Sequence, residues 1–266
     1  MRVVSLSCSN TEIVCALGCA ELLVGVDDHS DRPAEVVARL PRVGPDLQID
    51  VSAVAALKPD LVLASLTVPG HERVVAALEA AGLPFTAPEP VSLDDVYADI
   101  ETVARALDVS ERGSALVAEL KAELKEVFAA PTAPSNTPAE RPAVLVQWWN
   151  RPTISPGRLS WVTDLIELAG GANPLGREEV KSRPLSDEEV AALNPDAIVL
   201  AWCGVAPEKY RPEVIYRNPS WQGVSAVAKR QVYPVPEAYL GRPGPGLRHG
   251  LVALRSVVAG AVRAHR

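Results

Sequence analysis

The heptapeptide VAALKPD at residues 54–60 returns as VAALNPD at residues 190–196, with six of the seven residues identical. Each copy runs into an apolar stretch, at 61–64 and at 197–201. Proline cannot continue a helix and biases the residue before it away from the right-handed helical conformation, whereas a short apolar run suits a strand buried on both faces. The repeat therefore predicts one unit used twice: a helix end, a proline turn and a buried strand.

Two copies of this unit predict two similar α/β lobes, with a cleft between them in which a small ligand binds. The chain has 266 residues, more than the roughly 100 to 200 residues usual for a single domain. We expect an N-terminal lobe at 1–108, a linking helix and Pro-rich loop at 109–142, and a C-terminal lobe at 143–266. Alternating strands and helices indicate mostly parallel sheets, which place their ligands at the carboxyl ends of the strands.

Hydrophobic periodicity and helix-end signals predict the individual elements. A long amphipathic helix at 111–128 joins the lobes, and the loop at 130–138 is rich in proline. Ser9 or Asn10 is the expected N-cap of the first helix. The expected strands are at 3–6, 22–26, 61–64, 85–87, 143–149, 197–202 and 231–235, and the other helices at 10–17, 51–57, 72–81, 93–107, 161–168, 247–264 and after the capping box at 186–189.

The charge of the chain limits its partners. The formal net charge is −7 and the calculated pI is about 5.2, whereas nucleic acids and anionic membranes attract clustered Lys and Arg. No apolar run reaches the ~18 residues that a membrane-spanning helix needs. We therefore expect a monomer that binds a small molecule, with neither nucleic acid binding nor membrane insertion.

Cysteine usage bears on location. Cys8, Cys15, Cys19 and Cys203 form no CxxC pair and no zinc-type cluster, which favours buried free thiols in a reducing compartment. The stretch Ala16–Cys19 imitates a lipoprotein cleavage site, but polar residues at 7 and 9–12 interrupt the apolar region that should precede it. The sequence thus predicts a cytoplasmic protein, or a periplasmic or lipid-anchored one if a leader precedes Met1.

A set of short motifs along nearly the whole chain carries a family resemblance. The set resembles the class III substrate-binding proteins of ABC importers, and within that class it is most similar to the cobalamin-binding (BtuF-like) proteins. The motifs are SLS at 5–7, NTE at 10–12, VGV at 24–26, VG at 43–44, ALKPDLV at 56–62, LAGGAN at 168–173, SDE at 186–188, PDAIV at 195–199 and RPGPGL at 242–247.

This resemblance implies a rigid linking helix, little hinge motion and a corrinoid, haem or siderophore as ligand. It assigns ligand contacts to His29, where the similar proteins carry a Tyr, and to Asp46 and Leu47, in a segment that elsewhere reaches over the macrocycle with a Trp. The segment after the last strand contacts the corrinoid in these proteins. Its candidate contacts here are Glu237, Tyr239 and Arg242.

The tryptophans suggest a second set of contacts. A corrinoid is a broad, partly apolar macrocycle edged with amides, so its site needs flat aromatic surface. Trp148 and Trp149 end one expected strand and Trp202 ends another. Neighbouring strand residues point to opposite faces, so one of the adjacent pair can be a core residue instead. The Gly-rich run at 241–246 precedes a helix and is either a phosphate-binding turn or a plain connection.

The resemblance implies docking to a permease through two glutamates, and this sequence has one of them. The similar proteins present a glutamate near the start of one helix in each lobe, and Glu188 keeps this position in the second lobe. Ser52 occupies the equivalent position in the first lobe. Glu188 also has a local role, because an acidic residue in the first turn suits the helix dipole.

Catalytic motifs are missing from the sequence. It contains no nucleophile elbow, HExxH motif or P-loop, so we predict no catalytic residue and no protein metal site. The function expected is binding of cobalamin or cobinamide as a ligand, for uptake, storage or hand-over without chemical conversion. The alternatives are a haem or ferric siderophore binding protein and, in another class, a two-lobe enzyme component that holds a metal cluster on convergent cysteines.

Overall fold

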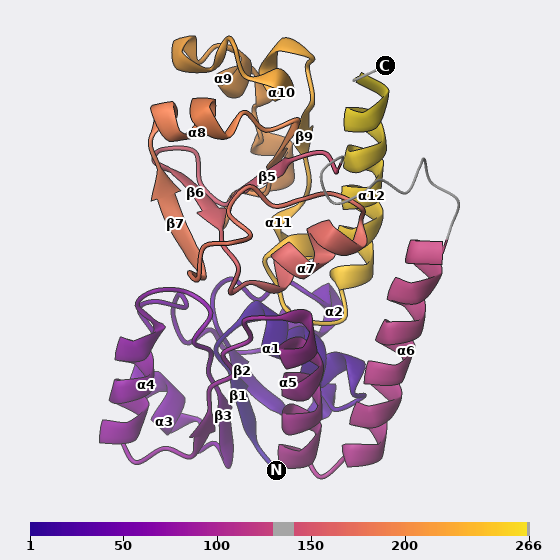
Figure 1. Ribbon diagram of the computed structural model, residues 1–266. Helices are drawn as coiled ribbons and strands as arrows, with labels where there is room; N and C mark the ends of the chain where they lie inside the picture. The colour runs from indigo at the N-terminus through magenta and orange to yellow at the C-terminus, as the bar shows by residue number, and fades with distance from the viewer. Residues whose placement is uncertain (130–140, 265–266) are drawn as a thin grey trace. The chain divides into compact units, whose positions relative to one another are not determined.

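The computed structural model describes residues 1–129 and 141–264 (Figure 1). The chain divides into two compact units. The first comprises residues 1–90 and 94–120, and the second comprises residues 91–93 and the described residues from 121 onward. The proline-rich loop expected at 130–138 lies outside the described residues.

The first unit is built on a parallel sheet of four strands in the order β2-β1-β3-β4. The central strand β1 is fully buried, including the polar Ser5 at its end. The strands are β1 (Val3–Ser5), β2 (Leu23–Val26), β3 (Leu61–Leu63) and β4 (Phe85–Thr86), and the helices are α1 (Cys8–Ala16), the 3-10 turn Ala20–Leu22, α2 (Ala34–Val37), α3 (Val51–Ala56), α4 (His71–Ala80) and α5 (Leu93–Ala106).

The second unit has a parallel sheet in the order β5-β8-β9 and a separate antiparallel pair, β6-β7. The strands are β5 (Val144–Gln147), β6 (Thr153–Pro156), β7 (Ser182–Leu185), β8 (Ala197–Leu200) and β9 (Val232–Pro234). The helices are α7 (Trp161–Leu168), α8 (Asp187–Leu193), α9 (Pro212–Tyr216), α10 (Ser225–Ala228), α11 (Glu237–Leu240) and α12 (Leu247–Ala264), with 3-10 turns at Pro207–Lys209 and Pro219–Trp221.

The sequence repeat is a structural repeat. Its first copy links α3 to β3 and its second links α8 to β8. Lys58 and Asn194, the residues before the two prolines, both adopt left-handed backbone angles, with φ of 48° and 43°. Each proline thus follows a residue that has left the helix. The sheets of the two units also confirm the predicted fold class of two α/β lobes with mostly parallel sheets.

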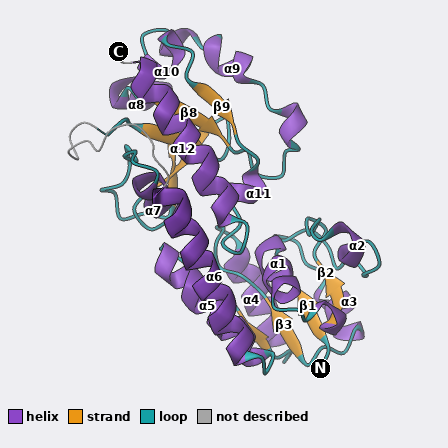
Figure 2. Ribbon diagram, turned by 90° about the vertical axis from the view of Figure 1, so that its right-hand side faces the viewer, coloured by secondary structure: helices purple, strands orange, loops and turns teal. Residues whose placement is uncertain are grey.

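The connecting helix α6 (Ser110–Ala129) is continuous and passes from the residues of the first unit to those of the second (Figure 2). It exceeds the predicted 111–128 by one residue at each end. In the described part of the chain, no helix is long and apolar enough to span a membrane.

Several predicted details were wrong. The first helix begins at Cys8, so its N-cap is Ser7, whose hydroxyl accepts from the backbone N–H of Asn10. Asn10 instead donates its side-chain amide to the carbonyl of Ala64 at 2.7 Å. The β6-β7 pair was not predicted, because its short segments carry no clear alternation of apolar and polar residues. The strands before Trp148 and Trp202 end earlier than expected, at Gln147 and Leu200.

Candidate functional site

The candidate site in the first unit lies at the carboxyl edge of its sheet. All four strands are parallel, so the loops that follow them emerge at the same edge. His29 follows β2, and His71 opens α4 after β3. The strand β1 lies between β2 and β3 in the sheet, so the two histidines flank its end.

A tight turn at 44–48 brings Asp46 and Leu47 to this edge. Gly44 has φ of +100°, and a Cβ there would lie 2.7 Å from the carbonyl oxygen of Gln48, so only glycine fits. The backbone N–H of Gln48 closes the turn on the carbonyl of Pro45 at 2.8 Å.

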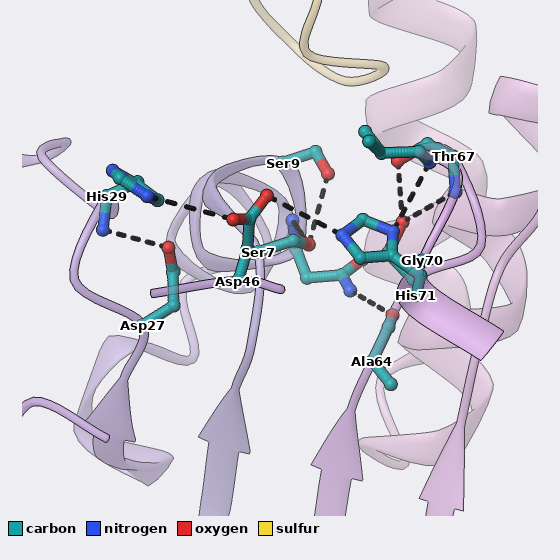
Figure 3. A network of polar contacts seen from close by, with 12 residues as sticks. Ser7, Ser9, Asp27, His29, Asp46, Ala64, Thr67, Gly70 and His71 are labelled. Carbon is teal, nitrogen blue, oxygen red and sulfur yellow. Dashed lines mark hydrogen bonds and ion pairs between the residues drawn. The ribbon is translucent and has the colours of Figure 1, made fainter. Parts of the chain in front are cut away.

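Asp46 contacts both histidines, one with each carboxylate oxygen. Its Oδ1 lies 3.7 Å from Nε2 of His29 and its Oδ2 lies 3.5 Å from Nε2 of His71. Figure 3 shows Asp46 between the two imidazoles, above the end of the sheet. The His71 side chain is only 5% exposed, whereas that of His29 is 52% exposed. The contact with His71 lowers the pKa of Asp46, which stays ionised between the two rings.

The loop that carries His29 is held by a second aspartate. Asp27 is buried and accepts from the backbone N–H of His29 at 2.9 Å and from the Ser30 hydroxyl. Burial raises the pKa of Asp27 above its usual range. Arg42 donates to the carbonyls of Asp27 and Ser30, at 2.7 and 2.6 Å. These bonds fix the backbone of the loop while the imidazole of His29 reaches solvent.

Exposed apolar side chains border this polar cluster. Leu47 is 45% exposed and Val68 is 41% exposed. Both lie against the start of α4, because a Cβ on Gly70 would be 3.2 Å from Leu47 and the N–H of Val68 donates to Nδ1 of His71 at 3.3 Å. The edge therefore combines exposed apolar surface with an accessible imidazole and a carboxylate.

In the second unit, the three candidate tryptophans follow the neighbouring strands β5 and β8 but differ in exposure. Trp149 is 45% exposed and Trp148 is half-buried. Trp202 is a core residue with 8% exposure, and its indole N–H donates to Oε1 of Gln147 at 3.0 Å. Its ring also packs against Tyr210 with centroids 5.5 Å apart. Burial therefore leaves Trp202 little ring surface for a ligand, against the expectation from its place after a strand.

The segment after β9 contains the remaining candidates. Glu237 and Arg242 form an ion pair at 3.5 Å, and Tyr239 stacks on His249 with ring centroids 5.1 Å apart. The backbone N–H of Glu237 donates to the hydroxyl of the buried Tyr210 at 3.1 Å, and burial raises the pKa of this tyrosine to about 12. These contacts join the segment to the loop after β8.

The candidates thus fall into separate groups within the two units: His29, Asp46 and Leu47 in the first, and the tryptophans with 237–242 in the second. His71 was missed because the helix was expected to begin one residue later, at Glu72. A histidine directly after Gly70, where a strand-to-helix loop ends, was the available signal. Glu188 is exposed in the first turn of α8, whose predicted capping box is confirmed, and Ser52 is exposed in the first turn of α3.

The cysteines and possible metal ligands do not converge. None of the four cysteines forms a disulfide. Cys19 is buried, Cys8 and Cys15 are half-buried, and Cys203 is exposed, so the expectation of buried thiols was wrong for Cys203. Burial raises the pKa of the Cys15 thiol to about 11. Among the residues that the structure describes, no group of three or more His, Cys, Asp and Glu side chains could hold a metal ion.

Two α/β units with parallel sheets and an unbroken connecting helix define the class III binding-protein fold. Residues 3–239 match the sequence model of the family described as "Periplasmic binding protein", and the chain belongs to this family. Proteins of this class bind small molecules and pass them to ABC transporter permeases.

Individual relatives point to more than one ligand. The chain is 28% identical to the uncharacterized ABC transporter substrate-binding lipoprotein YvrC of Bacillus subtilis, over 95% of this chain and 78% of that one. It is 27% identical to a vitamin B12-binding protein of Vibrio cholerae, over 92% and 84% of the two chains. The structure is similar to the periplasmic heme-binding protein RhuT of Roseiflexus, with 29% identity, 98% coverage of both chains and a TM-score of 0.79.

These names describe binding proteins rather than enzymes. YvrC is named a lipoprotein and RhuT a periplasmic protein. They give no support to the cytoplasmic location expected from the sequence.

Proposed function

We propose that this protein binds a corrinoid, cobalamin or cobinamide, and presents it to an ABC permease without chemical conversion. The observation that carries the proposal is the carboxyl edge of the first unit, where the exposed Leu47 and Val68 border the accessible imidazole of His29. Apolar surface beside a few hydrogen-bonding groups suits a macrocycle edged with amides.

In the second unit we propose Trp149 and Tyr239 as the aromatic contacts. Trp149 is the most exposed of the three candidate tryptophans, and Tyr239 lies in the segment after β9, the last strand of the parallel sheet. Large, rigid aromatic rings offer extensive contact area to a flat ligand. Trp148, Glu237 and Arg242 are proposed as neighbouring contacts, and Trp202 supports them from the core.

The charge of the candidate residues favours a corrinoid over haem or a ferric siderophore. Haem brings two carboxylates, and many siderophore complexes are anionic. The candidates in both units include the carboxylates of Asp46 and Glu237 but a single guanidinium, that of Arg242, which is ion-paired with Glu237. Anionic ligands need positively charged side chains in their site, whereas the neutral amides of a corrinoid do not.

Permease docking rests on Glu188, which is exposed at the start of α8. An exposed carboxylate can pair with a basic side chain of a partner at little desolvation cost. Ser52 offers no equivalent charge on α3. We therefore propose that the second unit docks on the permease through Glu188. The Glu188→Gln variant should weaken docking in a reconstituted transporter and leave corrinoid affinity unchanged.

The test is a titration of the purified protein with cyanocobalamin, dicyanocobinamide, haemin and a ferric hydroxamate siderophore. Calorimetry gives stoichiometry, and visible spectra show binding of each coloured ligand. We expect one-to-one binding of a corrinoid and weaker binding of the other two. Saturation by haemin or the siderophore, with no heat from either corrinoid, would assign the protein to the alternative ligand.

A further inference from the structure

His71 has no role in the proposed site, although it is the most buried member of the cluster. Its side chain is 5% exposed, and its Nε2 lies 3.5 Å from Oδ2 of Asp46. The other carboxylate oxygen faces Nε2 of His29 at 3.7 Å. One carboxylate therefore connects a buried imidazole to a solvent-accessible one, as Figure 3 shows.

The hydrogen bond from Val68 determines the tautomer of His71. The backbone N–H of Val68 donates to Nδ1 at 3.3 Å, which requires a lone pair on that nitrogen. A neutral imidazole has one N–H donor and one acceptor, so the proton of His71 lies on Nε2 and faces Asp46. His71 is thus a fixed donor that anchors one side of the carboxylate.

Asp46 acts on His29 by charge, because the 3.7 Å between Nε2 and Oδ1 is longer than a hydrogen bond. A negative carboxylate attracts an N–H and repels a nitrogen lone pair, so it favours the neutral tautomer of His29 with the proton on Nε2. Its Nδ1 is then an acceptor, and none of the described residues donates a hydrogen bond to it. With the backbone of His29 held by Asp27 and half of its side chain exposed, this acceptor is available to a ligand.

We propose that His71 is a positioning residue, which acts through Asp46 to present Nδ1 of His29 as an acceptor for an amide N–H of the ligand. This inference rests on the proposed function and adds a basis for its selectivity. Corrinoid side chains end in amides, which donate hydrogen bonds, whereas the carboxylates of haem are ionised at neutral pH and offer no N–H. The contacts from His71 through Asp46 to His29, which we call the relay, therefore favour ligands that bear amides.

The first test uses the ligand-free protein, so that it does not depend on the identity of the ligand. Two-bond ¹H–¹⁵N spectra of the histidine rings report which nitrogen carries the proton. We expect the Nε2–H form of His29 in the unmodified protein and in His71→Gln, whose side-chain amide can still donate to Asp46. His71→Phe keeps an aromatic ring but no donor, and Asp46→Ala removes the acceptor. Both should raise the fraction of the Nδ1–H form.

Asp28→Asn is the matched control, because it removes an exposed negative charge next to His29 without touching the relay. It should leave the ring spectrum unchanged. If the His71→Phe substitution at a buried position prevents folding, the Asp46→Ala variant still tests the relay, because the Asp46 side chain is partly exposed. An unchanged His29 tautomer in Asp46→Ala would overturn the relay.

The second test measures affinity. His71→Phe should weaken corrinoid binding about five- to tenfold, which is the effect of disturbing one hydrogen bond, and His71→Gln should restore most of it. Equal losses in both variants would indicate a packing role for His71 and overturn the proposal. If the unmodified protein binds no corrinoid, the proposed function fails, while the ring spectra still test the relay by themselves.

Discussion

Asp196 accepts a hydrogen bond from the backbone N–H of Ala143 at 2.8 Å, and its own N–H returns one to the Ala143 carbonyl at 2.8 Å. Asp60 makes the same two-way contact with Arg2, at 2.6 and 2.8 Å. These aspartates end the two copies of the repeated heptapeptide, and their partners directly precede β5 and β1. Each repeat thus joins the start of its own strand to that of the neighbouring strand.

We predict that Asp196→Ala destabilises the protein by about 1 to 3 kcal/mol, since the N–H of Ala143 loses its acceptor at the start of β5. Urea denaturation followed by circular dichroism measures the free energy of unfolding. Glu213→Ala, which removes an exposed carboxylate on α9, is the matched control and should have little effect. Equal stability of the two variants would show that the contact contributes nothing.

A second prediction concerns Asp99 in α5. Burial and the nearby Asp95 raise its pKa to about 7, and its Oδ2 has no hydrogen-bond partner among the described residues. Because the folded protein binds this proton more tightly than the unfolded chain, stability falls as the pH rises from about 4 through about 7. Asp99→Asn should therefore be more stable than the unmodified protein at pH 8.5, by about 1 to 2 kcal/mol.

The advantage of Asp99→Asn should shrink at pH 5, where the aspartate is protonated in the folded protein. Urea unfolding at both pH values gives the comparison. Asp94→Asn is the control on the same helix, since Asp94 is exposed. A difference that does not vary with pH would contradict the raised pKa.

The aromatic contacts supply a third prediction. Trp149→Ala or Tyr239→Ala should weaken corrinoid binding by about 1 to 3 kcal/mol if these rings stack on the macrocycle. Calorimetric titration measures the change. Phe128→Ala, which removes another exposed aromatic side chain, on α6, should bind as tightly as the unmodified protein. Unchanged affinity in both test variants would remove these residues from the site.

The fourth prediction concerns the sequence that imitates a lipoprotein cleavage site. Cleavage before Cys19 would delete β1, whose Val3 and Val4 are fully buried at the centre of the first sheet, together with α1. Each such side chain contributes about 1.5 to 3 kcal/mol, against a total stability of roughly 5 to 15. A chain that begins at Cys19 should be insoluble on expression. Recovery of a soluble chain with native circular dichroism would reopen the lipoprotein interpretation of this site.

The sequence by itself predicted two α/β units with mostly parallel sheets, although it did not predict the β6-β7 pair. The repeated heptapeptide predicted both helix-to-strand connections, because proline acts on its own neighbours whatever the rest of the chain does. The capping box at Ser186 and the bounds of α7 and α12 were also predicted correctly, since caps and helical periodicity are local signals. Helix α6 was placed to within one residue at each end for the same reason.

The detailed surroundings of the candidate residues depended on tertiary structure. Trp202 was expected to end a strand at the edge that faces the ligand. Its ring contacts Gln147 and Tyr210, which lie 55 residues before it and 8 residues after it, and it is 8% exposed. His71 lies 25 residues from Asp46 and 42 from His29, and the parallel order of β2, β1 and β3 brings the three together. Local propensity determines which segments form helices and strands, whereas burial and side-chain contacts arise only when distant segments pack, because they depend on neighbours that the local sequence does not contain.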